Sequence, residues 1–187
     1  MTLKDRLPPL NESTWTLEQR KEAEKIISGP RGELIAPFQV LLRNPQLMNC
    51  TQQLGEYLRY SSTIGHRLTE LTILITARYW HQTVEWQIHA PIAIEKGISS
   101  KDVEAINFNQ QPNSLKYDEQ VVYDFCMELQ KTKKISDQCW SDAITLFGEK
   151  GVIDLIGIQG YYSFLAMVMN ASQTSALNTD VKLQKLE

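Results

Sequence analysis

Residues 66–80 read HRLTELTILITARYW, and this stretch decides the fold class. At 3.6 residues per turn its apolar side chains cover more than one face, which is typical of a helix packed on several sides. The strict alternation of a half-buried strand is absent. The pattern therefore predicts a central helix, whose apolar positions are Leu68, Leu71, Ile73, Leu74, Ile75 and Ala77.

The segments on both sides have the same helical periodicity, and short breaks rich in Gly, Pro, Asn or Ser separate them. The next helix, over residues 82–96, ends at Gly97, and Pro91 inside it predicts a kink near His89. We expect an all-α protein with one domain over residues 1–187 and a frayed tail after 173. Further helices are expected at 17–27, 37–43, 45–60, 99–106, 115–131, 137–147 and 151–171.

The composition limits the classes of partner. The chain has 187 residues, 42% of them hydrophobic, which is enough for the core of one domain. A formal net charge of -3 offers no positive surplus for nucleic acid. Residues 1–10 lack an apolar signal segment, and the apolar stretch 152–169 contains Asp154 and Gln159. We expect a cytoplasmic protein that binds a small molecule, and neither nucleic acid nor a membrane.

The three cysteines, Cys50, Cys126 and Cys139, form neither a Cys-x-x-Cys redox pair nor a zinc spacing. Cys126 shares a helical stripe with apolar residues and is expected to be buried and inert. No metal or cofactor motif is present, so we expect the protein to need neither.

Three residues are candidates for proton-transfer chemistry. Glu70 lies on an apolar stripe of the central helix, and a buried carboxylate must find a partner or hold a proton. Glu85 and His89 lie one turn apart on the next helix, where a carboxylate and an imidazole can exchange a proton. Since both helices flank the turn near His81, Glu70 and His89 should share a pocket with Glu85.

Structural alternatives exist for each of these residues. Glu70 can form an ion pair with Arg59, Arg67 or Arg78, or pair with His66 at the helix start. Glu85 and His89 can form a solvated helix pair, or His89 can be a hydrogen-bonded core histidine.

The same residues carry a resemblance to a known family. Residues 67–78, followed by VEWQIHA at 84–90 and EKGIS at 95–99, resemble the signature of carboxymuconolactone decarboxylase-like proteins, of the alkyl hydroperoxidase D-like superfamily. The likeness covers nearly the whole chain and is most specific over 66–99. It implies a helical bundle that assembles as a trimer or hexamer. Outside the signature it extends to RLPPL at 6–10, GPRG at 29–32, Pro37-Phe38, Phe147-Gly148, Asp154-Leu155 and GYY at 160–162.

The family has two branches with different chemistry. One removes carbon dioxide from a lactone acid without a cofactor. The other is a thiol peroxidase whose site has a glutamate, two cysteines three apart and a histidine. On this chain that pattern places the glutamate at Glu70, the histidine at His89, and the cysteines at Gln82 and Glu85. An amide and a carboxylate cannot cycle between dithiol and disulfide, so the dithiol mechanism is not available at this site.

The resemblance and the residues together favour a cofactor-free lyase or related proton-transfer enzyme acting on a small carboxylated or lactone-like substrate. His89 would be the general acid/base, oriented by Glu85 or Glu70. The alternatives are a peroxiredoxin-type antioxidant that uses another cysteine and a non-catalytic oligomeric scaffold. Expected substrate-binding residues are Trp86, Gln82, Tyr161 and Tyr162, with Arg59 or Arg78 holding a substrate carboxylate.

Overall fold

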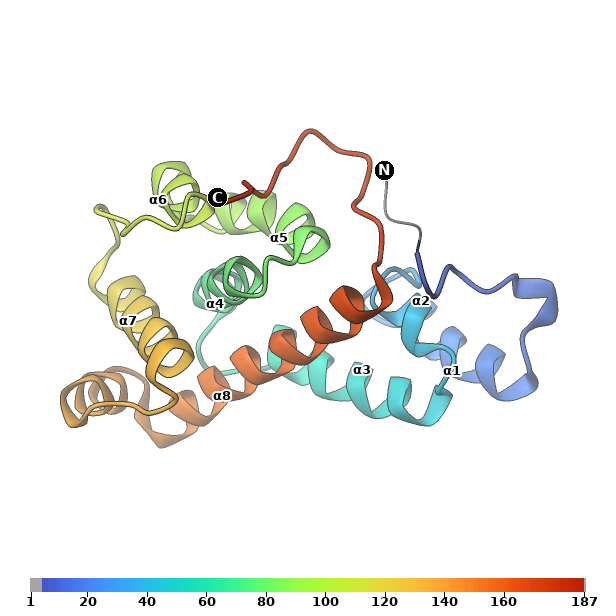
Figure 1. Cartoon of the computed structure of the whole chain (residues 1–187). Helices are drawn as coiled ribbons and strands as arrows, with labels where there is room; N and C mark the ends of the chain where they lie inside the picture. The colour runs from blue at the N-terminus through green and yellow to red at the C-terminus, as the bar shows by residue number, and fades with distance from the viewer. Residues whose placement is uncertain (1–4, 187) are drawn as a thin grey trace.

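The computed structural model describes residues 5–186 and is all-helical over that range, as the sequence predicts (Figure 1). A 3-10 helix, Glu12–Thr14, precedes eight α-helices. Their bounds are α1 Leu17–Ile27, α2 Phe38–Leu41, α3 Pro45–Tyr60, α4 His66–Tyr79, α5 Thr83–Glu95, α6 Ser100–Asn107, α7 Tyr117–Thr132 and α8 Asp137–Ser172.

The predicted central helix is α4, which packs against α3, α5, α6, α7 and α8. Figure 1 shows α5, α6, α7 and α8 arranged around it. Every residue of α4 from Leu68 to Arg78 is buried. Because this helix has no solvated face in the middle, the polar side chains that it carries must find partners inside the protein.

Local signals set the helix ends. Thr16 caps α1 through a capping box with Gln19, and Asn44 caps α3 directly before Pro45. Ser99 caps α6. Gly97 follows the end of α5 with φ 100°, a conformation that glycine adopts without strain. Helix α5 itself continues through Pro91 to Glu95.

The two helices expected over 137–147 and 151–171 are both present and together make up α8, with a kink at Gly148 between them. Gly148 has φ 65° and ψ 175°, which is not a helical conformation, so the chain changes direction there. By length and composition α8 could cross a membrane, but core helices pass the same test. Because 56% of its most apolar window is buried and it packs against α3, α4 and α7, α8 is a core helix here.

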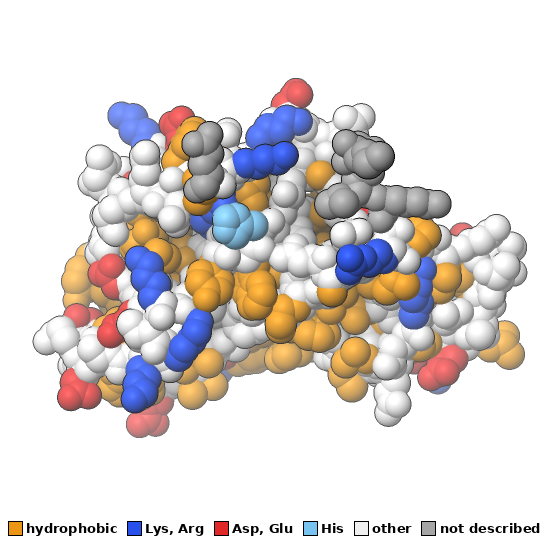
Figure 2. All heavy atoms as spheres, in the orientation of Figure 1, with side chains coloured by type: hydrophobic (Ala, Val, Ile, Leu, Met, Phe, Trp, Pro, Cys, Tyr) orange, Lys and Arg blue, Asp and Glu red, His pale blue; other side chains and the backbone are white. Residues whose placement is uncertain are grey.

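One face of α8 remains apolar and exposed. Ile153, Ile156 and Met167 are 63%, 37% and 45% exposed. Figure 2 shows hydrophobic side chains gathered over the lower half of the molecule, where Figure 1 places α8 and α3. An exposed apolar band of this kind is typical of a surface that another protein chain covers.

The tail after Gln173 differs from the expected frayed end. It has no regular secondary structure, but the side-chain amide of Gln87 donates to the carbonyls of Leu177 and Val181, at 3.1 Å each. The Leu177 N–H in turn donates to Gln87 Oε1 at 2.7 Å. Val181 and Leu183 pack against the core. The tail is therefore held across α5 by a side chain whose role helical periodicity does not reveal.

A buried carboxylate–histidine–carboxylate site

Helices α4 and α5 bring Glu70 and His89 into direct contact. The two helices are joined by a turn at His81, whose φ of 51° lets the chain reverse over a few residues. Because α4 and α5 pack side by side, His89 Nδ1 lies 2.6 Å from Glu70 Oε2. This distance is that of a strong, charge-assisted hydrogen bond.

Glu85 occupies the other edge of the same imidazole. One turn before His89, it places Oε2 3.3 Å from His89 Nε2. The side chains of Glu70, Glu85 and His89 are only 3%, 3% and 4% exposed. Glu85 also lies in the first turn of α5, where the helix dipole favours a negative charge. The result is a buried carboxylate–imidazole–carboxylate chain, called here the triad.

The triad determines the protonation of its histidine. Burial lowers the pKa of His89, but attraction to Glu70 and the hydrogen bonds to Glu70 and Glu85 outweigh it, so the net pKa is raised. An imidazolium can donate from both ring nitrogens, and each nitrogen of His89 has a carboxylate oxygen beside it. The two carboxylates lie at opposite ring edges and do not converge on one point. Within residues 5–186 no group of three or more His, Cys, Asp or Glu side chains is arranged to hold a metal ion.

Arg59 and two tyrosines surround the triad. Arg59 Nε lies 4.0 Å from Glu70 Oε1. The ring of Tyr162 meets His89 edge-on with centroids 5.3 Å apart, and Tyr161 packs against Tyr162 in the same way at 5.2 Å. Burial raises the pKa of Tyr161 to about 12 and that of Tyr162 well above 10. Both phenols therefore keep their protons at neutral pH and can act as hydrogen-bond donors.

Sequence reasoning missed Arg31, which lies beside Tyr161. If Gly55 of α3 had a Cβ, that atom would stand 2.1 Å from Tyr161 Oη and 2.7 Å from Arg31 Nη2. Glycine at this position therefore lets the phenol and the guanidinium approach α3 closely. The signal was present in the GPRG stretch at 29–32, but it lies too far along the chain from the triad for periodicity to connect the two.

Several buried polar atoms around the triad have no hydrogen-bond partner within residues 5–186. They are Glu85 Oε1, Tyr161 Oη, and both Nε and Nη2 of Arg31. Buried polar atoms are normally paired, and unpaired ones cost free energy unless they serve a function. Nε and Nη2 form one edge of the guanidinium, the edge that grips a carboxylate with two parallel hydrogen bonds.

The triad reaches the surface on its Glu70 side. A cleft of about 390 Å³ is lined there by Arg59, Tyr60, His66, Glu70, Ile92, Glu95 and Lys96. His66 stands against the ring of Tyr60, 6.3 Å between centroids, and no hydrogen bond joins it to Glu70. Glu70 is instead paired with His89 and Arg59.

Three of the expected substrate-binding residues point elsewhere. Trp86 lines a separate recess with Pro91 and residues of α6, so it does not wall the triad. Gln82 caps α5, because its Oε1 accepts from the Val84 N–H at 2.6 Å and its Nε2 donates to Asn170 Oδ1 at 2.8 Å. Arg78 pairs with His81 rather than with Glu70. Helical periodicity predicted on which side of its helix each of these residues lies, but it did not predict which residues they contact.

Comparison with known proteins is informative at the level of structure. No family model and no curated protein matches the sequence. A peroxidase-related protein from Silicibacter sp. TM1040 superposes with a TM-score of 0.74 at 14% identity, over 95% of this chain and 92% of that one. An alkylhydroperoxidase AhpD core protein from Ralstonia eutropha JMP134, also peroxidase-related, gives 0.77 at 11% identity, over 93% of both chains.

The likeness extends to a third solved structure, a cysteine-to-alanine variant of the debrominase Bmp8 in complex with 2,3,4-tribromopyrrole. It has a TM-score of 0.71 at 14% identity, over 95% of both chains. The chain has the alkyl hydroperoxidase D-like fold. At these identities the similarity concerns the fold, and the chemistry must be argued from the side chains of this chain.

None of the three cysteines of this chain belongs to the triad. Cys50 is exposed, Cys126 is buried and Cys139 is half-buried, and all three are free. Burial raises the pKa of Cys126 and of Cys139 to about 12. Since the thiolate is the reactive form, these two cysteines are poor nucleophiles at neutral pH.

Proposed function

We propose that this protein is a cofactor-free, lyase-like enzyme that transfers protons on a small carboxylated or lactone-like substrate. The observation that carries the proposal is the buried Glu70–His89–Glu85 chain with a histidine of raised pKa. Enzymes that move protons at neutral pH rely on such coupled, water-excluded groups.

Within this proposal Glu85, rather than His89, is the group that meets the substrate. Both ring nitrogens of His89 are occupied by carboxylates, whereas Glu85 Oε1 has no partner within the described residues. Glu85 Oε1 would take a proton from a carbon next to a carbonyl group, and the electron pair would form an enolate. The enolate would then expel an oxygen from the neighbouring carbon, so that a carbon–carbon double bond forms as the carbon–oxygen bond breaks, and the same carboxyl group would give its proton to the departing oxygen.

His89 and Glu70 would serve as positioning residues. The imidazolium holds Glu85 in place and balances its charge, while Glu70 fixes the ring through Nδ1. The Tyr161 hydroxyl would donate to the developing enolate oxygen. The free Nε and Nη2 edge of Arg31 suits the substrate carboxylate, a role for which the sequence suggested Arg59 or Arg78.

The test is a screen of lactone acids and related carboxylates for turnover and for exchange of substrate hydrogen with deuterated water. Glu85→Gln is expected to abolish both, and His89→Gln to reduce them at least about tenfold. Arg31→Lys is expected to raise KM more than it lowers kcat, because lysine cannot form the two parallel hydrogen bonds.

Glu24→Gln is the matched control for these variants. It makes the same chemical change at an exposed carboxylate of α1 that does not line the cleft beside the triad. This variant should keep wild-type turnover. Full activity in both Glu85→Gln and His89→Gln would exclude the proposed chemistry.

A further inference from the structure

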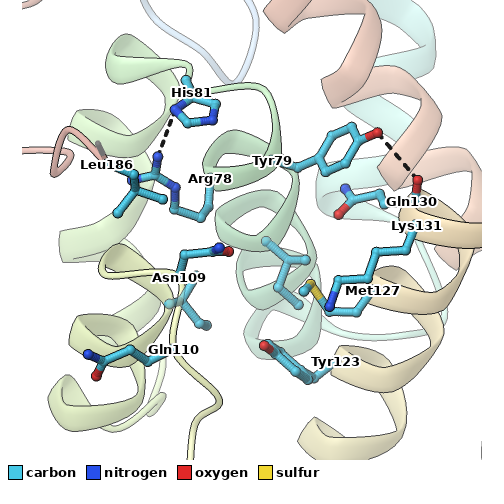
Figure 3. A pocket seen from close by; sticks show the side chains of 12 residues that line it. Arg78, Tyr79, His81, Asn109, Gln110, Tyr123, Met127, Gln130, Lys131 and Leu186 are labelled. Atoms are coloured by element: carbon cyan, nitrogen blue, oxygen red, sulfur yellow. Dashed lines mark hydrogen bonds between the residues drawn. The ribbon is translucent and has the colours of Figure 1, made fainter.

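A second cavity, of about 300 Å³, lies between α4, α7, the connection between α6 and α7, and the C-terminal tail (Figure 3). None of the triad residues lines it. Its volume is at the lower end of the range for small-molecule sites. One part of its wall is apolar, formed by residues such as Ile75, Tyr123 and Met127, and the rest is polar.

The polar part contains a buried cation without a counter-ion. Arg78 is 4% exposed, and its Nη1 donates to the carbonyls of Asn107 and Gln184, at 3.0 and 2.7 Å. No Asp or Glu within residues 5–186 forms an ion pair with it. A buried charge balanced only by neutral groups is costly, so an anion in this cavity would be strongly favoured.

His81 adds a directed donor at the rim. Arg78 Nη2 lies 2.8 Å from His81 Nδ1, the contact dashed at the top of Figure 3. Because a guanidinium has no acceptor, His81 Nδ1 must accept this hydrogen bond. Burial and the charge of Arg78 lower the pKa of His81, so the neutral ring carries its proton on Nε2.

The side chain of Gln130 gives a second, independent indication that this cavity binds a ligand. This α7 residue is 7% exposed, yet neither its side-chain nitrogen nor its side-chain oxygen has a hydrogen-bond partner within the described residues. Figure 3 shows its amide turned from α7 toward α4, into the space that Arg78 and Tyr79 border. A buried amide without partners is expected where a polar group of a ligand completes it.

We propose that this cavity is a second binding site, separate from the triad, for a small aromatic or aliphatic monocarboxylate that bears a polar group opposite its carboxylate. The carboxylate faces Arg78, whose positive charge it balances, and His81 and Lys131 also line the cavity. The apolar body lies against Ile75, Tyr123 and Met127, and the opposite polar group meets Gln130.

The probes for this site are 4-hydroxyphenylacetate, phenylacetate and the uncharged 4-hydroxyphenylacetamide. Titration calorimetry on the full chain should show 4-hydroxyphenylacetate binding at least about tenfold more tightly than the amide, a difference of about 1.4 kcal/mol. The chemical shift of the Gln130 side-chain amide should move with the same binding curve.

Two variants locate the binding. Met127→Trp fills the cavity and should abolish the binding of every probe. Gln130→Leu removes the amide, so it should weaken 4-hydroxyphenylacetate about tenfold while leaving phenylacetate unchanged. Asp124→Asn, an exposed change on the same helix, is the control and should bind as the wild type does. Thermal melts confirm that each variant is folded.

One further variant separates this site from the triad. Arg31→Gln removes the proposed carboxylate-binding edge beside Tyr161 and should leave binding of 4-hydroxyphenylacetate unchanged. The proposal is overturned by equal affinity for the carboxylate and the amide, by the absence of binding at about 10 mM ligand, or by binding that survives Met127→Trp. Because the calorimetry does not depend on turnover, a failure of the proposed enzyme activity leaves this result intact.

Discussion

Replacing Glu70 with glutamine tests whether His89 carries its proton in the folded protein. The substitution keeps the size of the side chain and an oxygen that can accept from His89 Nδ1, but it removes the negative charge 2.6 Å from the ring. Burial would still lower the pKa of His89, and only Glu85, at 3.3 Å, would remain to raise it. The imidazolium would lose the larger of its two stabilising attractions.

The expected loss follows from the burial of the pair. Both side chains are 3–4% exposed, so solvent screens their attraction very little. A hydrogen bond to a charged group contributes about 2–3 kcal/mol, and stranding a buried charge adds to that loss. We expect the free energy of unfolding to fall by about 2–3 kcal/mol, and the midpoint of thermal unfolding by about 5–10 °C for a chain of this size.

The stability lost in Glu70→Gln should depend on pH, and the raised pKa of His89 determines in which direction. The pKa of His89 is raised above its unfolded value of 6.5, so its contribution to stability is complete below that pH. That contribution is lost as the pH rises through the higher, folded value. The difference between wild type and Glu70→Gln should therefore be larger at about pH 6 than at about pH 9.

Chemical denaturation at both pH values measures this difference. The control is Glu95→Gln, which makes the same change at an exposed carboxylate of α5 and should alter stability by no more than about 0.5 kcal/mol. If Glu70→Gln is as stable as this control, or if its loss is the same at both pH values, His89 does not hold a proton between the two carboxylates.

The remaining predictions concern thiol chemistry, assembly and packing. Thiol-driven peroxide turnover should be negligible, because no pair of cysteines lies beside His89 and burial holds the pKa of Cys126 and Cys139 at about 12; robust turnover that is lost when all three cysteines become serine would refute this. Light scattering at micromolar concentration should report a homo-oligomer, a trimer or hexamer by family resemblance, which Ile153→Glu weakens; a monomeric wild type would disprove it. Gly55→Ala should cost about 1–3 kcal/mol of stability, whereas Gly160→Ala, whose Cβ meets nothing within 4 Å, should cost far less.

Local sequence signals determined most of the helical frame. Thr16 and Asn44 begin α1 and α3, and Gly97 ends α5, through hydrogen bonds and backbone angles that involve only nearby residues. Periodicity also identified α4 as the central helix, because an apolar pattern on several faces requires neighbours on several sides. The same spacing placed Glu85 and His89 one turn apart, and the short turn at His81 brought Glu70 within reach of the ring.

Tertiary structure alone decided which side chains surround that chain. Arg31 and Tyr161 come together beside α3 from segments distant in sequence, and Gly55 permits the contact only because α3 crosses at that point. Trp86 faces α6, and the tail is held by Gln87, because of packing that no local repeat encodes. A helical repeat fixes where a residue lies around its own axis, whereas its partner depends on which distant segment buries that face. The amino-acid sequence therefore determined the carboxylate–histidine chain, and the packing of distant segments determined its pocket.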